Sequence, residues 1–314
     1  MALTLAEAAK LSQNDLQRGV VETFVIQSSV LDRIPLLNIL GNAYAYNEEL
    51  TLPGVEFRAV NAAYAESTGT VNPRTETLVI LGGDADVDTF IVQTRGNLND
   101  QRATQTVLKV KAATTKYQDA FINGDTAVDA NSFDGLKKRV TGAQIISAGT
   151  NGAPIVGNGG TDAHAFFDAL DALVAAVPGG ADAIYSNAAI RAKIMSAARR
   201  LGGSDFMNES LTGKRVPTYN GIPLLDIGTK ADGTLIIPQT ETQGTSTVAT
   251  SIYAVKFGSD ENEAGVVGLT NGGVAVKDLG EIDAKPVFRT RIEFFCGLAV
   301  FGRGAARLVG VLNG

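Results

Sequence analysis

The sequence has no tryptophan, and it has one histidine and one cysteine in 314 residues. A single cysteine cannot form an internal disulfide, and its scarcity fits a reducing compartment. The usual zinc sites need more histidine and cysteine ligands than this chain has. A serine–histidine–aspartate triad would have to use His164, but no nucleophile-elbow pattern accompanies it. We therefore expect His164 to be an ordinary surface residue.

Charged residues are also scarce, at 19% of the chain where about a quarter is usual. Few charges are available to cover the surface, so we expect much of that surface to contact other subunits. The net charge of −6 and the lack of long basic runs argue against general affinity for nucleic acid, which needs clustered lysine and arginine.

Long hydrophobic runs are missing too. The most apolar run, residues 294–301, is far too short to span a bilayer. The first residues lack the basic and apolar regions of a signal peptide. We therefore expect a soluble protein that does not bind membranes and that no signal of its own exports.

Two short patterns resemble binding loops and fail in detail. The alternating aspartates of residues 84–88 resemble the start of a calcium loop, but Thr89 stands where glycine is needed and Arg95 where glutamate is needed. Alternation along a strand explains these aspartates better. The glycines of residues 157–160 lack the spacing of a dinucleotide or phosphate loop, so a flexible connection is the better interpretation.

Two features near the C-terminus are candidate sites. Arg289 and Arg291 with Glu293 could form one, but a strand edge that faces solvent or another subunit is the better interpretation. Cys296 lies among aromatic and aliphatic neighbours, which predicts a buried structural thiol. The sequence therefore predicts no catalytic, cofactor-binding or metal-ligating residue, and no enzyme.

The longest regular element that the sequence predicts is a helix over residues 99–123. Asn99 or Asp100 can cap its start, and Asn123 with Gly124 can end it. Apolar and small residues recur at helical spacing and form one stripe: Ala103, Val107, Val110, Thr114, Tyr117 and Phe121. At ~1.5 Å per residue the helix measures roughly 36 Å, which is long for a globular domain. We interpret it as a spine that carries a sheet and an arm; an ordinary core helix is the alternative.

Residues 1 to about 34 show helical spacing in pieces, and residues 4–7 have the pattern of a capping box. The first twenty or so have little apolar mass of their own. We interpret the first twenty residues as an arm that must lie on something else.

An extended segment follows from residue 44 to residue 93. Residues 55–59 alternate between apolar and charged side chains, as in a two-faced strand. Residues 65–73 are rich in turn formers, and residues 75–81 are expected to form the strand that runs back. This pattern predicts a long hairpin with a mobile tip, and a second strand over residues 87–92. An isolated two-stranded ribbon is marginal in water, so we expect neighbouring molecules to stabilise it.

Residues 125–285 form a second block, in which helices and strands mix without strict alternation, so the predicted class is α+β. Asp162 and Ser186 are expected to cap two helices. The short strands predicted here are residues 183–185, 222–227, 235–237, 251–256, 266–269 and 274–276. Two final strands, residues 288–294 and 305–312, are expected to pack beside the long helix, because their apolar face is the largest one left unmatched.

Five phrases, taken in order, resemble a major capsid protein of tailed bacteriophages with the Hong Kong 97-type fold. They are FINGD (121–125) followed by FDGL (133–136), YNGIPL (219–224), GGVAVKDLG (272–280) and RIEFFCGLAV (291–300). None is specific alone, but their order at this chain length is, and the resemblance covers nearly the whole chain.

The resemblance implies an α+β phage major capsid fold with four parts. They are an N-arm (1–30), an extended β-hairpin loop (44–92), a peripheral domain built on the long spine helix plus a sheet (31–43, 93–135 and 285–314), and an axial α+β domain (136–284).

The implied function is structural: the chain would self-assemble as hexamers and pentamers into the icosahedral head that encloses phage double-stranded DNA. The implied partners are other copies of the chain, a portal, a separate scaffolding protein and a decoration protein. No cofactor and no sequence-specific DNA binding are implied. The implied location is the virion, after assembly in the cytoplasm of the bacterial host.

Some members of the family crosslink a lysine of the extended loop to an asparagine of a neighbour. Here no lysine occurs between Lys10 and Lys109. We therefore expect a shell held by non-covalent contacts, which are strand pairing of the hairpin and ion pairs. The ion pairs would come from four charged residues of the loop: Glu56, Arg58, Arg74 and Glu76.

Two other interpretations stay open. An encapsulin-like nanocompartment shell would have the same fold and would hold cargo protein instead of DNA. A tail or adhesin component would be a binding module. Electron microscopy would separate shells from tubes or isolated oligomers, and neighbouring genes would separate the two kinds of shell.

Overall fold

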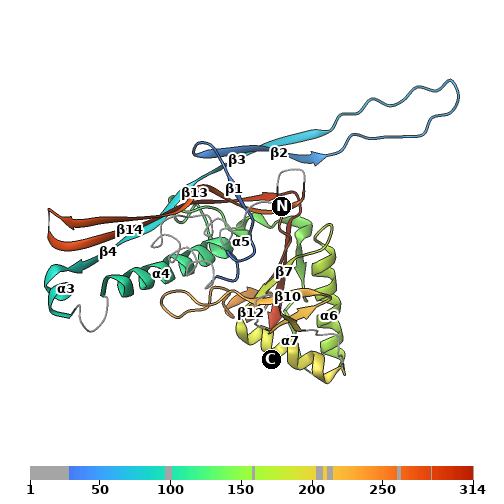
Figure 1. The fold of residues 1–314 in the computed structure, drawn as a ribbon. Helices are drawn as coiled ribbons and strands as arrows, with labels where there is room; N and C mark the ends of the chain where they lie inside the picture. The colour runs from blue at the N-terminus through green and yellow to red at the C-terminus, as the bar shows by residue number, and fades with distance from the viewer. Residues whose placement is uncertain are drawn as a thin grey trace.

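The computed structural model describes residues 28–95, 101–157, 160–202, 208–210, 215–259, 263–283 and 285–313. The fold mixes helices and sheets, as the sequence predicts (Figure 1). A long sheet lies against a long helix, a compact sheet carries two further helices, and a two-stranded ribbon projects from the body (Figure 1). The predicted N-terminal arm, residues 1–30, falls almost wholly outside the described residues. Only its last three residues are described, and residues 29–33 form a turn.

The long sheet has the order β1 (Leu36–Asn38), β13 (Gly265–Ile282), β14 (Lys285–Phe301) and β4 (Val79–Asp88). β14 is antiparallel to both of its neighbours, and β1 is parallel to β13. The two short strands predicted at 266–269 and 274–276 are one long strand. It is interrupted by a bulge between Thr270 and Val274, where Gly272 and Gly273 have φ of +81° and +72°.

The strand predicted over residues 87–92 is wrong after its first two residues. β4 ends at Asp88, and Thr89–Arg95 forms a short helix, α3. The Asp88 carboxylate accepts a hydrogen bond from Phe90 N at 2.8 Å. An aspartate at a helix start can satisfy a free backbone N–H in this way, so the chain leaves the extended conformation there.

The predicted long helix is present as α4, Gln101–Asn123, but its buried face differs in part from the predicted stripe. Val107 is 38% exposed and Ala103 is exposed, whereas Thr106 is buried. The Thr106 hydroxyl donates to Arg102 O at 2.8 Å, so its polar group is satisfied inside the helix. A search for apolar residues misses such a position. From Val110 onward the predicted face is confirmed.

The compact sheet contains nine strands. They are β5 (Ile145–Ser147), β6 (Ala153–Pro154), β7 (Ala183–Ser186), β8 (Asn208–Ser210), β9 (Arg215–Tyr219), β10 (Ile222–Asp226), β11 (Glu241–Gln243), β12 (Ser246–Val255) and β15 (Ala305–Leu312). The helices α6 (Gly160–Ala175) and α7 (Ala188–Arg200) pack on it through a buried apolar cluster (Figure 1).

β15 corrects the prediction that both C-terminal strands lie beside the long helix. Only β14 does so, whereas β15 pairs with β12, β5 and β6 in the compact sheet. The chain changes sheets at Gly302 and Gly304. A Cβ on Gly304 would lie 2.5 Å from the Cα of Gly265, so only glycine permits this close crossing.

The second predicted helix start also moves by one residue. Asn187, not Ser186, is the N-cap of α7, and its side chain accepts from Ile190 N at 2.9 Å. Ser186 is the last residue of the buried strand β7, which pairs with both β10 and β12. Asp162 lies within the first turn of α6, where a carboxylate favours the helix dipole.

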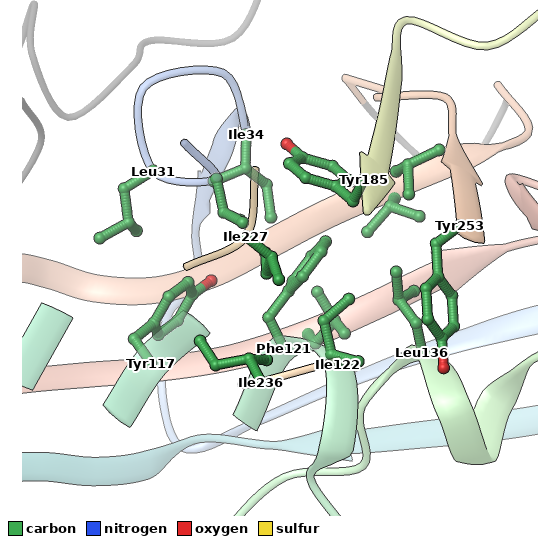
Figure 2. Close-up of a cluster of buried hydrophobic side chains, with 14 of the residues drawn as sticks. Leu31, Ile34, Tyr117, Phe121, Ile122, Leu136, Tyr185, Ile227, Ile236 and Tyr253 are labelled. Atoms are coloured by element: carbon green, nitrogen blue, oxygen red, sulfur yellow. The ribbon is translucent and has the colours of Figure 1, made fainter. Parts of the chain in front are cut away.

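One apolar core joins α4 to both sheets (Figure 2). The ring of Tyr117 on α4 lies 5.8 Å from that of Phe294 on β14, and Phe121 lies 6.0 Å from Tyr185 on β7. All four rings are essentially inaccessible to solvent. Each buried aromatic contributes about 1.5–3 kcal/mol of transfer free energy, so this shared core holds the helix and the two sheets together.

Candidate assembly surfaces

The projecting hairpin is β2 (Ala43–Thr51), β3 (Thr70–Thr77) and the residues 52–69 between them. The strands pair antiparallel from Ala43↔Thr77 to Thr51↔Thr70. Figure 1 shows the hairpin extending far from the body. Residues 55–59, predicted as a strand, form none. They have no partner strand, and Arg58 instead donates to the carbonyl of Ala62 at 3.3 Å.

The outer part of the hairpin exposes large apolar side chains. They are Leu52, Val55, Phe57, Val60, Tyr64 and Val71, and each is more than half exposed. Val55 is 95% exposed and Phe57 is fully exposed. Apolar side chains gathered on one exposed segment mark a surface for another protein. The hairpin therefore presents exposed apolar surface at a distance from the body of the subunit.

The base of the hairpin is held by an apolar cluster. Tyr46 is 6% exposed and packs edge-on against Phe301, with ring centroids 4.9 Å apart. Tyr44 lies beside both rings. The Tyr46 hydroxyl lies 3.3 Å from Val300 O and 3.4 Å from a Glu76 oxygen. Burial and the neighbouring Glu76 raise the pKa of Tyr46 to about 12, so it remains a neutral donor.

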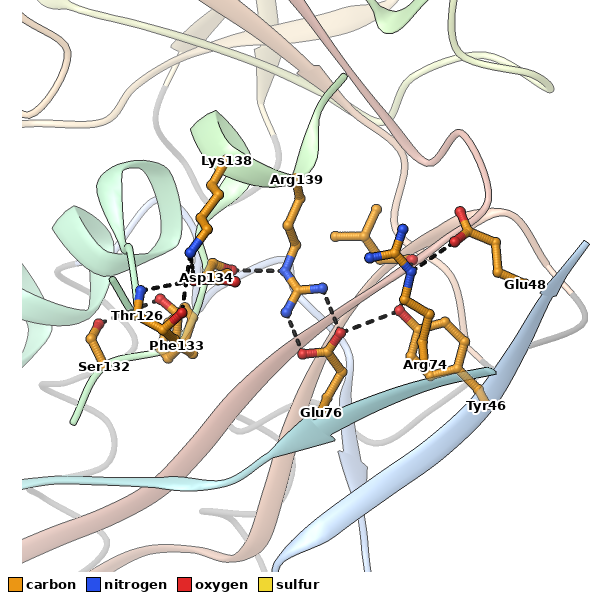
Figure 3. Close-up of polar contacts among 11 residues, drawn as sticks. Tyr46, Glu48, Arg74, Glu76, Thr126, Ser132, Phe133, Asp134, Lys138 and Arg139 are labelled. Atoms are coloured by element: carbon orange, nitrogen blue, oxygen red, sulfur yellow. Dashed lines mark hydrogen bonds and ion pairs between the residues drawn. The ribbon is translucent and has the colours of Figure 1, made fainter. Parts of the chain in front are cut away.

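An ion pair also joins the hairpin base to the body (Figure 3). Arg139 lies at the end of α5 (Leu136–Arg139). Its two terminal N–H groups donate hydrogen bonds to the two carboxylate oxygens of Glu76 on β3. Their side chains are 12% and 13% exposed. Burial lowers the pKa of Arg139, but the hydrogen bond and charge of Glu76 outweigh it and raise the pKa overall. Such two-pronged pairs are stronger and more directional than single contacts.

The four charged loop residues predicted to make inter-subunit ion pairs all have partners within the subunit. Arg74 binds Glu48 at 2.8 Å, and Glu76 binds Arg139. The Glu56 carboxylate accepts from Ala65 N at 2.7 Å. Arg58 lies over the Tyr64 ring, 5.1 Å from its centroid. For Glu76 the prediction is corrected, because this side chain is nearly buried within its own subunit.

The outer face of the long sheet carries a ladder of charges. Arg291 binds Asp84 at 2.8 Å, and Arg289 binds Asp86 at 2.6 Å. β14 lies between β13 and β4, so the interpretation of these arginines as a strand edge was wrong. The hydrogen bond from Arg291 lowers the pKa of Asp84, and that from Arg289 lowers the pKa of Asp86. The alternating aspartates are thus cross-strand partners of arginine.

Three of the sequence phrases have a backbone explanation. FINGD and FDGL meet where Gly135 N donates to Gly124 O at 2.9 Å. In YNGIPL, Asn220 and Gly221 have φ of +50° and +79° between the paired residues Tyr219 and Ile222. An Asn-Gly pair with both φ positive is the preferred two-residue hairpin turn.

Comparison with known proteins agrees with this architecture. Residues 13–166 match the family model of the Major capsid protein GP7. The chain is a major capsid shell protein of the Hong Kong 97 fold. A search of curated proteins finds no match for this capsid protein.

Solved structures share the fold at low sequence identity. The SrpI encapsulin of Synechococcus elongatus PCC 7942 is 20% identical with a TM-score of 0.65, over 100% of this chain and 97% of that one. The capsid of a native GTA particle is 17% identical with a TM-score of 0.63, and the match covers 91% of this chain and 89% of that one. A chain from Mycobacterium phage Bobi is 15% identical with a TM-score of 0.58, over 98% and 99%.

The residues that the sequence offered for chemistry have ordinary surroundings in the capsid protein. His164 is exposed on α6. Cys296 is 1% exposed, and burial raises the pKa of its thiol to about 12, so the predicted buried thiol is confirmed. Among the described residues, no three potential ligands are placed to hold a metal ion, and no helix is long and apolar enough to cross a bilayer. The family is one of structural proteins, not enzymes.

Arg139 is not among the residues that the sequence pattern indicates as functional. Its signal was weak: three consecutive basic residues, Lys137 to Arg139, directly after the phrase FDGL. Only the fold brings Arg139 to Glu76, which is 63 positions earlier in the chain.

Proposed function

We propose that this capsid protein assembles as hexamers and pentamers into the icosahedral head of a tailed phage, around double-stranded DNA. The match of residues 13–166 to the family model of a major capsid protein carries the proposal. That match includes the projecting hairpin and the long helix α4. A net charge of −6 suits a container that does not grip the polyanion inside it.

The projecting hairpin is proposed to be the extended loop that lies on a neighbouring subunit. Its exposed Val55 and Phe57 favour this role, because a ribbon that leaves such side chains in water gains stability from a partner. With no lysine between Lys10 and Lys109, the proposed contact is non-covalent.

A division into parts follows from the sheets. The long sheet with α4 would be the peripheral domain, the compact sheet with α6 and α7 the axial domain, and residues 1–30 the N-arm. Under this assignment β13 moves to the peripheral domain and β15 to the axial domain, which differs from the boundaries predicted from sequence. A portal, a separate scaffolding protein and a decoration protein are proposed partners, and the virion, assembled in the host cytoplasm, is the proposed location.

A second function is a nanocompartment shell that holds protein cargo. One observation favours it: the SrpI encapsulin superposes over 100% of this chain and 97% of its own, with a TM-score of 0.65. At 20% identity this likeness concerns the fold, which both functions share.

Electron microscopy of particles purified from cells that express the chain with its neighbouring genes tests the proposal. Closed shells with five-fold and six-fold capsomers are expected, and nuclease treatment should leave protected DNA inside them. Shells that lack DNA and contain a second folded protein would favour the nanocompartment. Tubes or isolated oligomers would contradict both functions.

A further inference from the structure

The short helix α5 contacts three parts of the subunit through three consecutive basic residues. Lys137 lies 3.7 Å from Glu241 of the compact sheet. Lys138 binds Asp125, which follows α4, at 2.6 Å. Arg139 binds Glu76 at the base of the projecting hairpin. One turn of helix therefore links the hairpin, the end of the long helix and the compact sheet. Figure 3 shows the link from Arg139 to Glu76 of the hairpin.

The hairpin meets the body through two short connections. One is the turn at residues 40–42, where Gly41 has φ of +98°. The other is Leu78, the single residue between β3 and β4. Leu78 N donates to Asn42 O at 2.8 Å, so the two connections lie side by side. A ribbon joined in this way can pivot unless other contacts fix its direction.

Contacts of two kinds at the hairpin base can fix that direction. Tyr46 packs on Phe301 through its ring, where dispersion contacts tolerate small rotations, and its hydroxyl makes one long hydrogen bond to Val300 O at 3.3 Å. The Glu76–Arg139 pair is a planar fork on a planar carboxylate, so it fixes both distance and orientation. Being nearly buried, it is also screened less by salt than an exposed pair.

We propose that Arg139 and Glu76 are positioning residues for shell assembly. They set the direction in which the hairpin leaves the subunit, and α5 couples that direction to the body. The proposal rests on the proposed function, in which the hairpin lies on a neighbouring subunit. A pre-set direction matters because ordering a mobile hairpin during association costs conformational entropy, and this cost weakens assembly.

The test measures the hairpin's direction in unassembled subunits. Spin labels would be placed at Val71→Cys near the outer end of β3 and at Leu108→Cys on α4, positions that are 58% and 52% exposed. Cys296 is 1% exposed and stays unlabelled in the folded protein. The variants are Glu76→Gln, which keeps the shape of the side chain, and Arg139→Gln. The matched control is Arg74→Gln, because Arg74 lies on the same hairpin and its pair with Glu48 is exposed.

A single narrow distance distribution is expected for the parent and for Arg74→Gln. A broadened or shifted distribution is expected for Glu76→Gln and Arg139→Gln, with partial recovery in the reversed pair Glu76→Arg with Arg139→Glu. The critical concentration for assembly should rise roughly tenfold in the two single variants. The control Arg74→Gln is compared in the distance measurement alone.

An unchanged distance distribution in Glu76→Gln would overturn the positioning role, whatever particles form. If the parent subunit forms no shells while the variant distributions broaden, the positioning role stands and the proposed function fails. Thermal unfolding of each variant, monitored by circular dichroism, checks that the distances are measured on a folded subunit. A reversed pair as broad as the single variants would also count against the proposal.

Discussion

Gly124 and Gly135 touch through their backbones at the junction of α4 and α5. Gly135 N donates to Gly124 O at 2.9 Å, and a Cβ on Gly135 would lie 2.4 Å from Ala120 O. Two of the sequence phrases, FINGD and FDGL, thus mark the two sides of one close crossing. The crossing places α5 beside the end of the long helix, where Arg139 reaches the hairpin base.

Gly135→Ala is expected to destabilise the subunit, because its Cβ would meet backbone atoms of α4 that cannot move independently. Overpacking of this kind costs about 1–3 kcal/mol. Chemical unfolding measures the change. The control is Gly149→Ala, whose Cβ would have its nearest atom at 3.3 Å, and it should cost less than about 1 kcal/mol. Equal stability of both variants would contradict the prediction.

Replacing Val55 and Phe57 by serine should reduce assembly without destabilising the subunit. Both side chains are exposed, so the free energy of unfolding should change by less than about 0.5 kcal/mol. Shell yield, measured by light scattering and electron microscopy, should fall. Val248→Ser, at a 60% exposed position of β12, is the control for loss of an exposed apolar side chain. Normal shell yield from the double variant would argue against a contact through the hairpin.

Mature particles should give one monomer band on a denaturing gel. The projecting hairpin has no lysine, because none occurs between Lys10 and Lys109, so the nucleophile for a lysine–asparagine bond is missing from it. The measurement is gel electrophoresis of particles boiled in detergent. A ladder of covalent multimers would show that another residue forms the bond.

Acid should weaken the long sheet through Asp84 and Asp86. Their arginine partners lower both pKa values in the folded protein, so the unfolded chain takes up protons first as the pH falls. The stabilisation is present above the unfolded pKa of about 3.9 and is lost as the pH falls through the folded values. Below pH about 4, the free energy of unfolding should depend less steeply on pH in the double variant Asp84→Asn, Asp86→Asn than in the parent protein. An unchanged slope would assign the acid sensitivity to other carboxylates.

Cys296 should resist alkylation in the folded subunit. Burial raises the pKa of its thiol to about 12, and only the thiolate reacts. Iodoacetamide at pH 8 should therefore modify the protein only after a denaturant is added, as mass spectrometry would show. Rapid modification without denaturant would mean that the long sheet opens on the timescale of the labelling.

The sequence by itself determined the features that depend on neighbouring residues. Helical spacing without glycine or proline defined α4, and alternation defined the buried face of β14, with Thr290, Ile292 and Phe294 inside. The order of the phrases indicated the family, because close backbone approaches and tight turns require glycine at fixed places, such as Gly124 and Gly221.

Only the tertiary structure decided which distant segments meet. β15 could have joined either sheet from its own pattern, and the crossing at Gly304 assigns it to the compact one. The partner of Glu76 could not be foreseen either, because an ion pair between residues 63 positions apart depends on how the whole chain packs. Local periodicity reports which face of an element is buried; it carries no information on what buries it, which is set by the competition among all segments for the same core.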